Sequence, residues 1–77
     1  MNAKDIVKSN ALKKLHDYIE CEINRLHDGG LSLNYFEFKP LPGSFTEEEF
    51  SEITSIVNSI LSSDGIQTYC KYNNINI

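Results

Sequence analysis

The sequence contains no long hydrophobic run. Its longest uninterrupted apolar stretches are two residues, such as Ile56-Val57 and Ile60-Leu61. A transmembrane helix needs about 20 consecutive apolar residues, so the sequence excludes a membrane span. The first residues, MNAKDIVKSNALKK, also lack the apolar core of a secretory signal peptide. We therefore expect a cytoplasmic protein that does not act at a membrane.

Cysteine is scarce, since the chain holds only Cys21 and Cys70. A secreted domain of this small size usually carries several disulfides. We expect both cysteines to be reduced thiols at half-buried positions, and a structural disulfide between them is the alternative.

Basic residues are also few, with seven lysines and arginines against eleven acidic residues. Residues 1–30 are electrically neutral, so the whole net charge of −4 lies in residues 31–77. Nucleic-acid binding needs several cations on one face, and this balance argues against it. The excess of Lys over Arg, together with many Asn and Ile, indicates an AT-rich genome such as that of a low-GC bacterium or its phage.

Motifs that carry known chemistries are absent. The sequence has no Gly-rich phosphate loop, HExxH, GxSxG or CxxC. One polar stripe has the spacing of a helix face: His16, Glu20, Asn24 and His27. Two histidines do not close a metal site, and we interpret the stripe as a solvated face. We expect no catalytic residue, no metal and no cofactor.

The chain is so short that its expected stability bears on whether it self-associates. Seventy-seven residues form a single domain, residues 1–77. In a chain of this size the apolar surface that folding buries roughly balances the conformational entropy that folding costs. An isolated copy is therefore marginally stable, and self-association would help it.

Two segments have the pattern of amphipathic helices. Residues 3–28 place apolar side chains on one face, and Asp28-Gly29-Gly30 supplies a stop. Asn2 is a possible cap, and Ser9-Asn10 is a second capping point at which this helix could break. The stripe consists of Leu12, Leu15, Ile19, Ile23 and Leu26.

The second helix begins with a capping box at Thr46 and Glu49, flanked by Phe45 and Phe50 as a hydrophobic staple. We expect it to end at Ser63-Asp64-Gly65. Its predicted buried stripe is Phe50, Ile53, Ile56, Val57, Ile60 and Leu61.

Two other segments have the alternation and aromatic content of strands, residues 31–39 and 66–77. The predicted fold is therefore α+β, a single small domain of order α-β-α-β. Its two helices pack on a short sheet, and a right-handed crossover makes the strands parallel. Because two strands leave open edges and an uncovered face, we expect a homodimer to complete the sheet.

Two groups of residues are candidates for an interaction surface. The aromatic group on the predicted strands is Tyr35, Phe36, Phe38, Tyr69 and Tyr72. Aromatic side chains on a sheet can stack on single-stranded nucleic acid, but basic neighbours are few here, so we assign them to the core and to a dimer interface. Phe36, Phe38 or Tyr69 should lie at that interface. The acidic group is Glu47, Glu48 and Glu52, next to the capping residue Glu49.

The function that these observations favour is a small, non-catalytic, intracellular protein-interaction module. Its composition suggests that a phage or mobile element encodes it to modulate a host protein. An alternative is an acidic inhibitor whose glutamates mimic nucleic acid and block a basic groove. A second alternative is a small metal- or thiol-dependent enzyme built across a dimer interface.

Overall fold

The computed structural model describes residues 2–75, and over this range the protein is helical. The elements are α1 (Ala3–Asp28), a short 3₁₀ turn η1 (Leu33–Tyr35), α2 (Glu47–Ile60) and α3 (Ser63–Tyr72). No residue from 2 to 75 belongs to a strand. The predicted α+β fold is therefore wrong, and so is the dimer through paired strands that depended on it.

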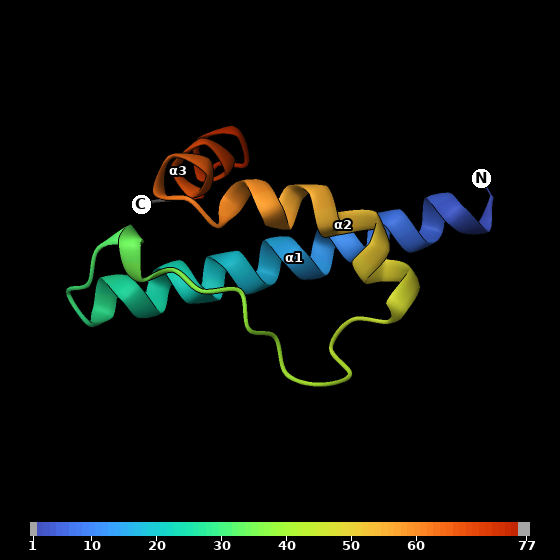
Figure 1. The fold of residues 1–77 in the computed structure, drawn as a ribbon, viewed down its shortest axis with the longest axis horizontal. Coiled ribbons are helices and arrows are strands. Elements are labelled where there is room, and N and C mark those ends of the chain that lie inside the picture. The colour runs from blue at the N-terminus through green and yellow to red at the C-terminus, as the bar shows by residue number, and fades with distance from the viewer. Residues whose placement is uncertain (1, 76–77) are drawn as a thin grey trace.

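The three α-helices form a small, elongated bundle (Figure 1). α1 runs along the longest dimension of the molecule, which is 42 Å. Residues 31–46 carry the chain back beside α1, so α2 then runs in the same general direction as α1. α3 is seen nearly end-on in Figure 1 and lies across the far end of the pair. None of these helices is long and apolar enough to cross a bilayer.

α1 begins and ends where the sequence predicts. The Asn2 side chain accepts a hydrogen bond from the Asp5 amide at 3.0 Å, and the helix continues unbroken through Ser9-Asn10. At its end Gly30 has a φ of 66°, which glycine adopts without strain. The Leu31 amide then reaches back to the Leu26 carbonyl at 2.8 Å, which closes a Schellman motif.

α2 also begins where predicted, and both halves of its capping box are formed. The Glu49 amide donates to the Thr46 hydroxyl at 3.1 Å, and the Thr46 amide donates to the Glu49 carboxylate at 2.9 Å. Its predicted buried stripe needs a correction at both ends. Phe50 is 42% exposed and Leu61 is 58% exposed, and Glu49 faces inward instead.

The reason is the register of α2 against α1. The buried positions are Glu49, Ile53, Val57 and Ile60. These positions are spaced by four, four and three residues, so they form one narrow helical face. Phe50 lies about 100° away from Glu49 around the helix and faces the preceding loop.

The predicted strand over residues 66–77 is a helix, α3, as far as Tyr72, and residues 76 and 77 lie outside the described residues. Ser62 caps it, because its hydroxyl accepts from the Gly65 amide at 3.0 Å. Ser63-Asp64-Gly65 is thus the first turn of a new helix and does not merely end α2. Ile66 and Cys70 are buried, and a spacing of four places them on one side in a strand and in a helix alike.

The predicted strand over residues 31–39 is a turn followed by an extended segment. A strand needs a neighbour for its backbone hydrogen bonds, and helix formation at α3 removes the expected one. The Tyr18 hydroxyl serves instead. It donates to the Glu37 carbonyl at 3.0 Å and accepts from the Lys39 amide at 2.8 Å.

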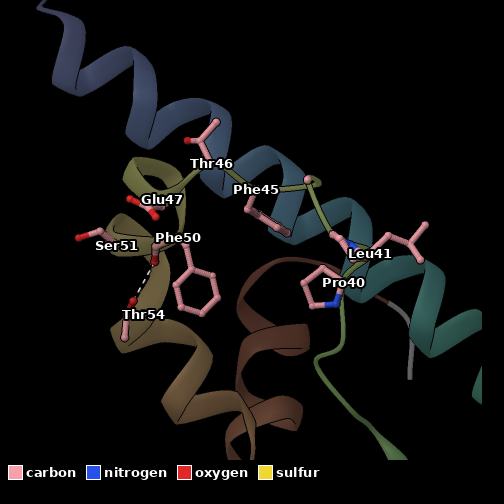
Figure 2. Close-up of a pocket in the computed structure, with 10 residues that line it drawn as sticks. Pro40, Leu41, Phe45, Thr46, Glu47, Phe50, Ser51 and Thr54 are labelled. Carbon is pink, nitrogen blue, oxygen red and sulfur yellow. Dashed lines mark hydrogen bonds between the residues drawn. The ribbon is translucent and has the colours of Figure 1, made fainter.

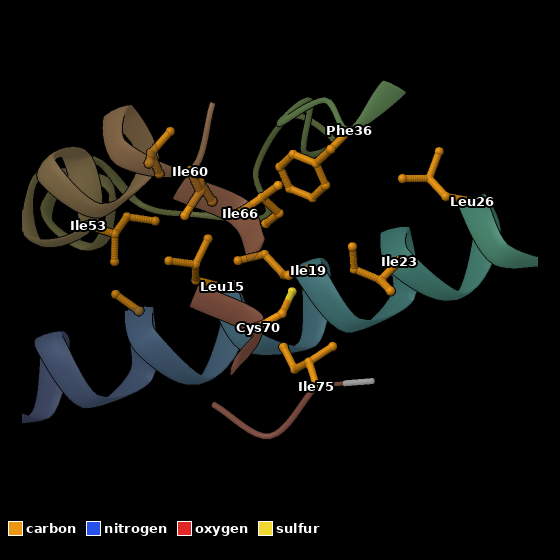
Figure 3. Close-up of a cluster of buried hydrophobic side chains, with 12 residues drawn as sticks. Leu15, Ile19, Ile23, Leu26, Phe36, Ile53, Ile60, Ile66, Cys70 and Ile75 are labelled. Carbon is orange, nitrogen blue, oxygen red and sulfur yellow. The ribbon is translucent and has the colours of Figure 1, made fainter. Parts of the chain in front are cut away.

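The core lies where the three helices and this segment meet (Figure 3). α1 contributes a full stripe, and Phe36 and Ile75 close the cluster from the connecting segment and the C-terminal end. The α1 stripe consists of Ala11, Leu15, Ile19, Ile23 and Leu26, each with no exposed surface. The apolar stripe of α1 is therefore covered by elements of the same chain.

Candidate interaction surface

A cluster of aromatic rings fixes the loop between η1 and α2. The ring of Phe38 lies 5.0 Å from that of Tyr18, 5.9 Å from that of Phe45 and 6.4 Å from that of Phe50, measured between centroids. The two residues predicted as a staple, Phe45 and Phe50, both lie beside the ring of Phe38. These contacts tie the loop to α1 on one side and to α2 on the other.

The loop and α2 enclose a groove, which we call the loop groove. It has a volume of about 590 Å³. Its lining residues are Pro40, Leu41, Pro42, Gly43, Phe45, Thr46, Glu47, Phe50, Ser51 and Thr54. Figure 2 shows the rings of Pro40 and Phe50 on opposite sides of this hollow, while Leu41 points outward. Leu41 is 79% exposed, so an aliphatic side chain stands at the rim with little contact to its own chain.

An ion pair behind the groove holds the start of α2 against α1. The Lys14 ammonium donates to the Glu49 carboxylate at 2.8 Å and lies 6.0 Å from the centre of the Phe45 ring. The hydrogen bond from Lys14, followed by that from the Thr46 amide, lowers the pKa of Glu49 below its ordinary value of 4.5. Glu49 is therefore ionised at neutral pH and occupied inside the protein.

A second hollow lies on the other side of the same loop and has a volume of about 550 Å³. Pro40, Leu41 and Phe45 belong to both hollows, and α1 supplies Tyr18 and the exposed Cys21 to this one. Burial raises the pKa of Tyr18, so its hydroxyl keeps the proton that it donates to the loop. The loop thus presents apolar side chains between the two hollows.

The predicted aromatic group does not form one surface. Phe36 is buried in the core, Phe38 belongs to the ring cluster, and Tyr69 is half-buried on α3. Tyr35 and Tyr72 remain exposed, at 61% and 80%. Phe36, Phe38 and Tyr69 are therefore largely taken up by contacts within one chain.

The predicted acidic group does stay together at the start of α2. Glu47 and Glu48 are exposed and Glu52 is half-buried, and all three line a groove against the first residues of α1. Only Glu47 also lines the loop groove. With Glu49 used internally, three carboxylates remain for any outside partner.

The polar stripe of α1 and the two cysteines form no common site. His16 lies 3.6 Å from Glu20, and Asn24 and His27 are exposed further along. Among residues 2–75, no three His, Cys, Asp or Glu side chains are grouped so as to hold a metal ion. Both cysteines are free, but neither is half-buried as predicted: Cys21 is exposed, and Cys70 is fully buried with its pKa raised by that burial.

Apart from Glu47, the residues of the loop groove were not predicted as interaction residues, because the segment Pro40-Leu41-Pro42-Gly43 follows the predicted strand and was assigned no role of its own. The signal was present in Leu41 itself. Proline on either side removes two backbone donors and prevents both helix and sheet pairing, so the leucine between them has no regular element with which to pack.

Comparison of this chain with protein-family models, with curated proteins and with solved structures finds no match.

Proposed function

We propose that this protein is a non-catalytic interaction module that binds a protein partner through the loop groove. The observation that carries the proposal is an apolar surface held in place by internal contacts. Leu41 and Phe50 are 79% and 42% exposed at one groove, while the ring of Phe38 and the hydroxyl of Tyr18 fix the loop beneath them. Apolar groups that are exposed together and anchored from behind are typical of docking sites.

Two features favour a protein partner over a small ligand. The groove is open to solvent, and Leu41 projects away from it (Figure 2). A small ligand gains affinity when a pocket surrounds it, which an open groove does not do. A protein surface covers the hollow and the projecting leucine together, which is how interface anchors work.

The cellular setting belongs to the same proposal. Two unpaired thiols, one of them exposed, suit a reducing compartment such as the cytoplasm. The AT-rich residue usage supports an origin in a low-GC bacterium or its phage, where the partner would be a host protein that the module modulates.

Site-specific photo-crosslinking in source cells tests the proposal. Benzoylphenylalanine is introduced at position 41 in one variant and at position 67 in the control, because Gln67 is exposed on α3 and does not line the groove. We expect position 41 to crosslink to a discrete protein that position 67 does not capture. Capture of the same proteins from both positions contradicts the assignment of the groove.

Affinity measurements with the captured protein then test the anchor. Burial of a leucine contributes about 1.5–3 kcal/mol, so Leu41→Ser should weaken binding about tenfold to a hundredfold. Glu48→Lys with Glu52→Lys should leave this binding nearly unchanged. Loss of binding in the glutamate variant alone would instead favour the acidic inhibitor that mimics nucleic acid.

A further inference from the structure

Residues 39–42 have the backbone constraints of a polyproline II helix, and we call them the proline segment. The ring of each proline fixes φ at about −65°, which is close to the value of this helix. Lys39 and Leu41 each precede a proline, and this neighbour favours an extended conformation over a helical one. Phe36, at the start of the same extended stretch, has φ of −63° and ψ of 131°, which are also close to polyproline II values. The segment is therefore preformed in the shape of a Pro-rich ligand.

A tight turn ends the proline segment. The Ser44 amide donates to the Leu41 carbonyl at 3.0 Å, and Gly43 has a φ of 84°. Proline at the second position and a glycine with positive φ at the third are typical of a type II β-turn. The turn and the two prolines together fix the direction in which the Leu41 side chain leaves the loop.

The base of the segment is fixed as well. The Lys39 amide donates to the Tyr18 hydroxyl at 2.8 Å, which ties the segment to α1. The rings of Phe38 and Phe45, one before the segment and one after it, have centroids 5.9 Å apart. Binding of this segment therefore orders little that is not already ordered, and a preformed ligand gains affinity for that reason.

Only part of the segment is free to meet a partner. Successive side chains of a polyproline II helix point in three directions, because the helix has three residues per turn. Pro40 is half-buried and faces Phe50 across the loop groove, whereas Leu41 and Pro42 are exposed (Figure 2). Lys39 lies 3.3 Å from the Glu37 carboxylate, so its charge is balanced locally. The free edge is thus the apolar pair Leu41-Pro42.

We propose that the Leu41-Pro42 pair enters a groove between aromatic rings on the partner protein. Aromatic-lined grooves recognise polyproline II segments, because this helix is preformed and loses little entropy on binding. The inference rests on the proposed function, since it names the chemistry of the partner at the same site. An aromatic side chain of the partner also suits the loop groove, where the Phe50 ring offers it a stacking or edge contact.

Calorimetric titration with the protein captured at position 41 tests this recognition. Pro42→Ala keeps the leucine but removes the ring, and burial of a side chain of this size is worth enough that binding should weaken about tenfold. Gly43→Ala leaves both contact residues in place. Its added Cβ would meet no atom within 4 Å, but the φ of 84° disfavours alanine. Loosening the turn in this way should weaken binding about threefold to tenfold.

The matched control is Ser51→Ala, which lines the loop groove outside the proline segment. It should leave the affinity unchanged, and thermal melts check that every variant folds.

Nuclear magnetic resonance tests the aromatic character of the partner's groove. The methyl protons of Leu41 and the ring protons of Pro42 should shift upfield in the complex, because they would lie over the faces of the partner's rings. The methyl protons of Leu61 are the control, since this residue is 58% exposed but does not line the loop groove. They should keep their positions.

Two results overturn the inference and leave the proposed function intact. One is an affinity that falls with Leu41→Ser but not with Pro42→Ala or Gly43→Ala, which indicates a pocket for leucine alone. The other is a complex in which the Leu41 and Pro42 protons do not move upfield, which indicates an aliphatic pocket. A partner that binds the Leu41→Ser and Pro42→Ala variants as tightly as the unmodified chain contradicts both proposals.

Discussion

Glu49 joins three parts of the chain through one carboxylate. It accepts from the Lys14 ammonium of α1 and from the amide of its own capping residue, Thr46, while its side chain faces the core. The sequence predicted only the capping role. The contact with Lys14 spans 35 residues of sequence, so no local pattern reveals it. A capping residue thereby also sets the distance between α1 and α2.

This arrangement predicts how stability depends on pH. The pKa of Glu49 is lowered in the folded state, so its ionised form stabilises the fold above its ordinary pKa of 4.5. That stabilisation is lost as the pH falls from 4.5 through the lower folded pKa. Urea unfolding at a series of pH values should show a decline in this range that is shallower in Glu49→Gln. Glu48→Gln is the matched control on the same turn, and an equal effect there would contradict this account.

The structure buries Phe36 in the core and leaves Phe50 partly exposed. The sequence pattern places Phe50 in the buried stripe of α2, but it is 42% exposed, whereas Phe36 is 8% exposed in the core. We therefore expect Phe36→Ala to cost about 3–5 kcal/mol through a cavity, and Phe50→Ala to cost about 1 kcal/mol. Thermal or urea melts measure both. Equal losses would mean that the groove side of α2 is packed more tightly than the structure indicates.

At the scale of elements, the two long helices were predictable because their signals are local. α1 has its cap, its stripe and its glycine stop within its own residues, and α2 has a complete capping box. These capping interactions join residues only a few positions apart, so they form independently of the tertiary contacts of the rest of the chain.

The third helix was not predictable from the same kind of pattern. Ile66 and Cys70 are the buried residues of α3, and their spacing of four satisfies strand and helix alternation equally. The β-branched and aromatic residues around them have a high strand propensity, which favoured the prediction of a strand. The interaction that starts α3 is the hydrogen bond from the Gly65 amide to the Ser62 hydroxyl. In the sequence, the same serine and glycine residues look like the end of the preceding helix. The strand predicted over 31–39 was wrong in turn, since its partner segment became helical.

The junction of α2 and α3 depends on Gly65. A Cβ atom at this position would lie 1.7 Å from the Ser59 carbonyl oxygen, so any larger residue forces the two helices apart. Gly65→Ala should therefore cost about 1–3 kcal/mol, as overpacking typically does. Gly29→Ala is the matched control, because it ends α1 with a φ of −84° and its added Cβ would be 3.5 Å from the nearest atom. Comparable melting temperatures for the two variants would show that α3 does not pack as described.

At the scale of the whole molecule, one long helix organises everything else. α2, α3 and the connecting segment all pack on the buried stripe of α1 or on one another around it. Local patterns predict the elements of such a bundle but not which surface residues are left over. The loop groove arises because the loop between α1 and α2 passes outside both helices.

The two thiols report on whether this bundle unfolds as one unit. Cys21 is exposed on α1, and Cys70 is fully buried on α3 with a raised pKa. A buried thiol reacts with iodoacetamide only when the structure around it opens. A domain of this size is typically stable by about 3–5 kcal/mol, so Cys70 should react about 10²–10⁴ times more slowly than Cys21. Ile53→Ala, which removes a fully buried side chain of α2 far from both cysteines in sequence, should speed the alkylation of Cys70 and leave that of Cys21 unchanged. Mass spectrometry of alkylated peptides over time measures both rates. If Cys70 reacts as fast as Cys21, α3 detaches readily from the rest of the bundle, and the three helices do not form one cooperative unit.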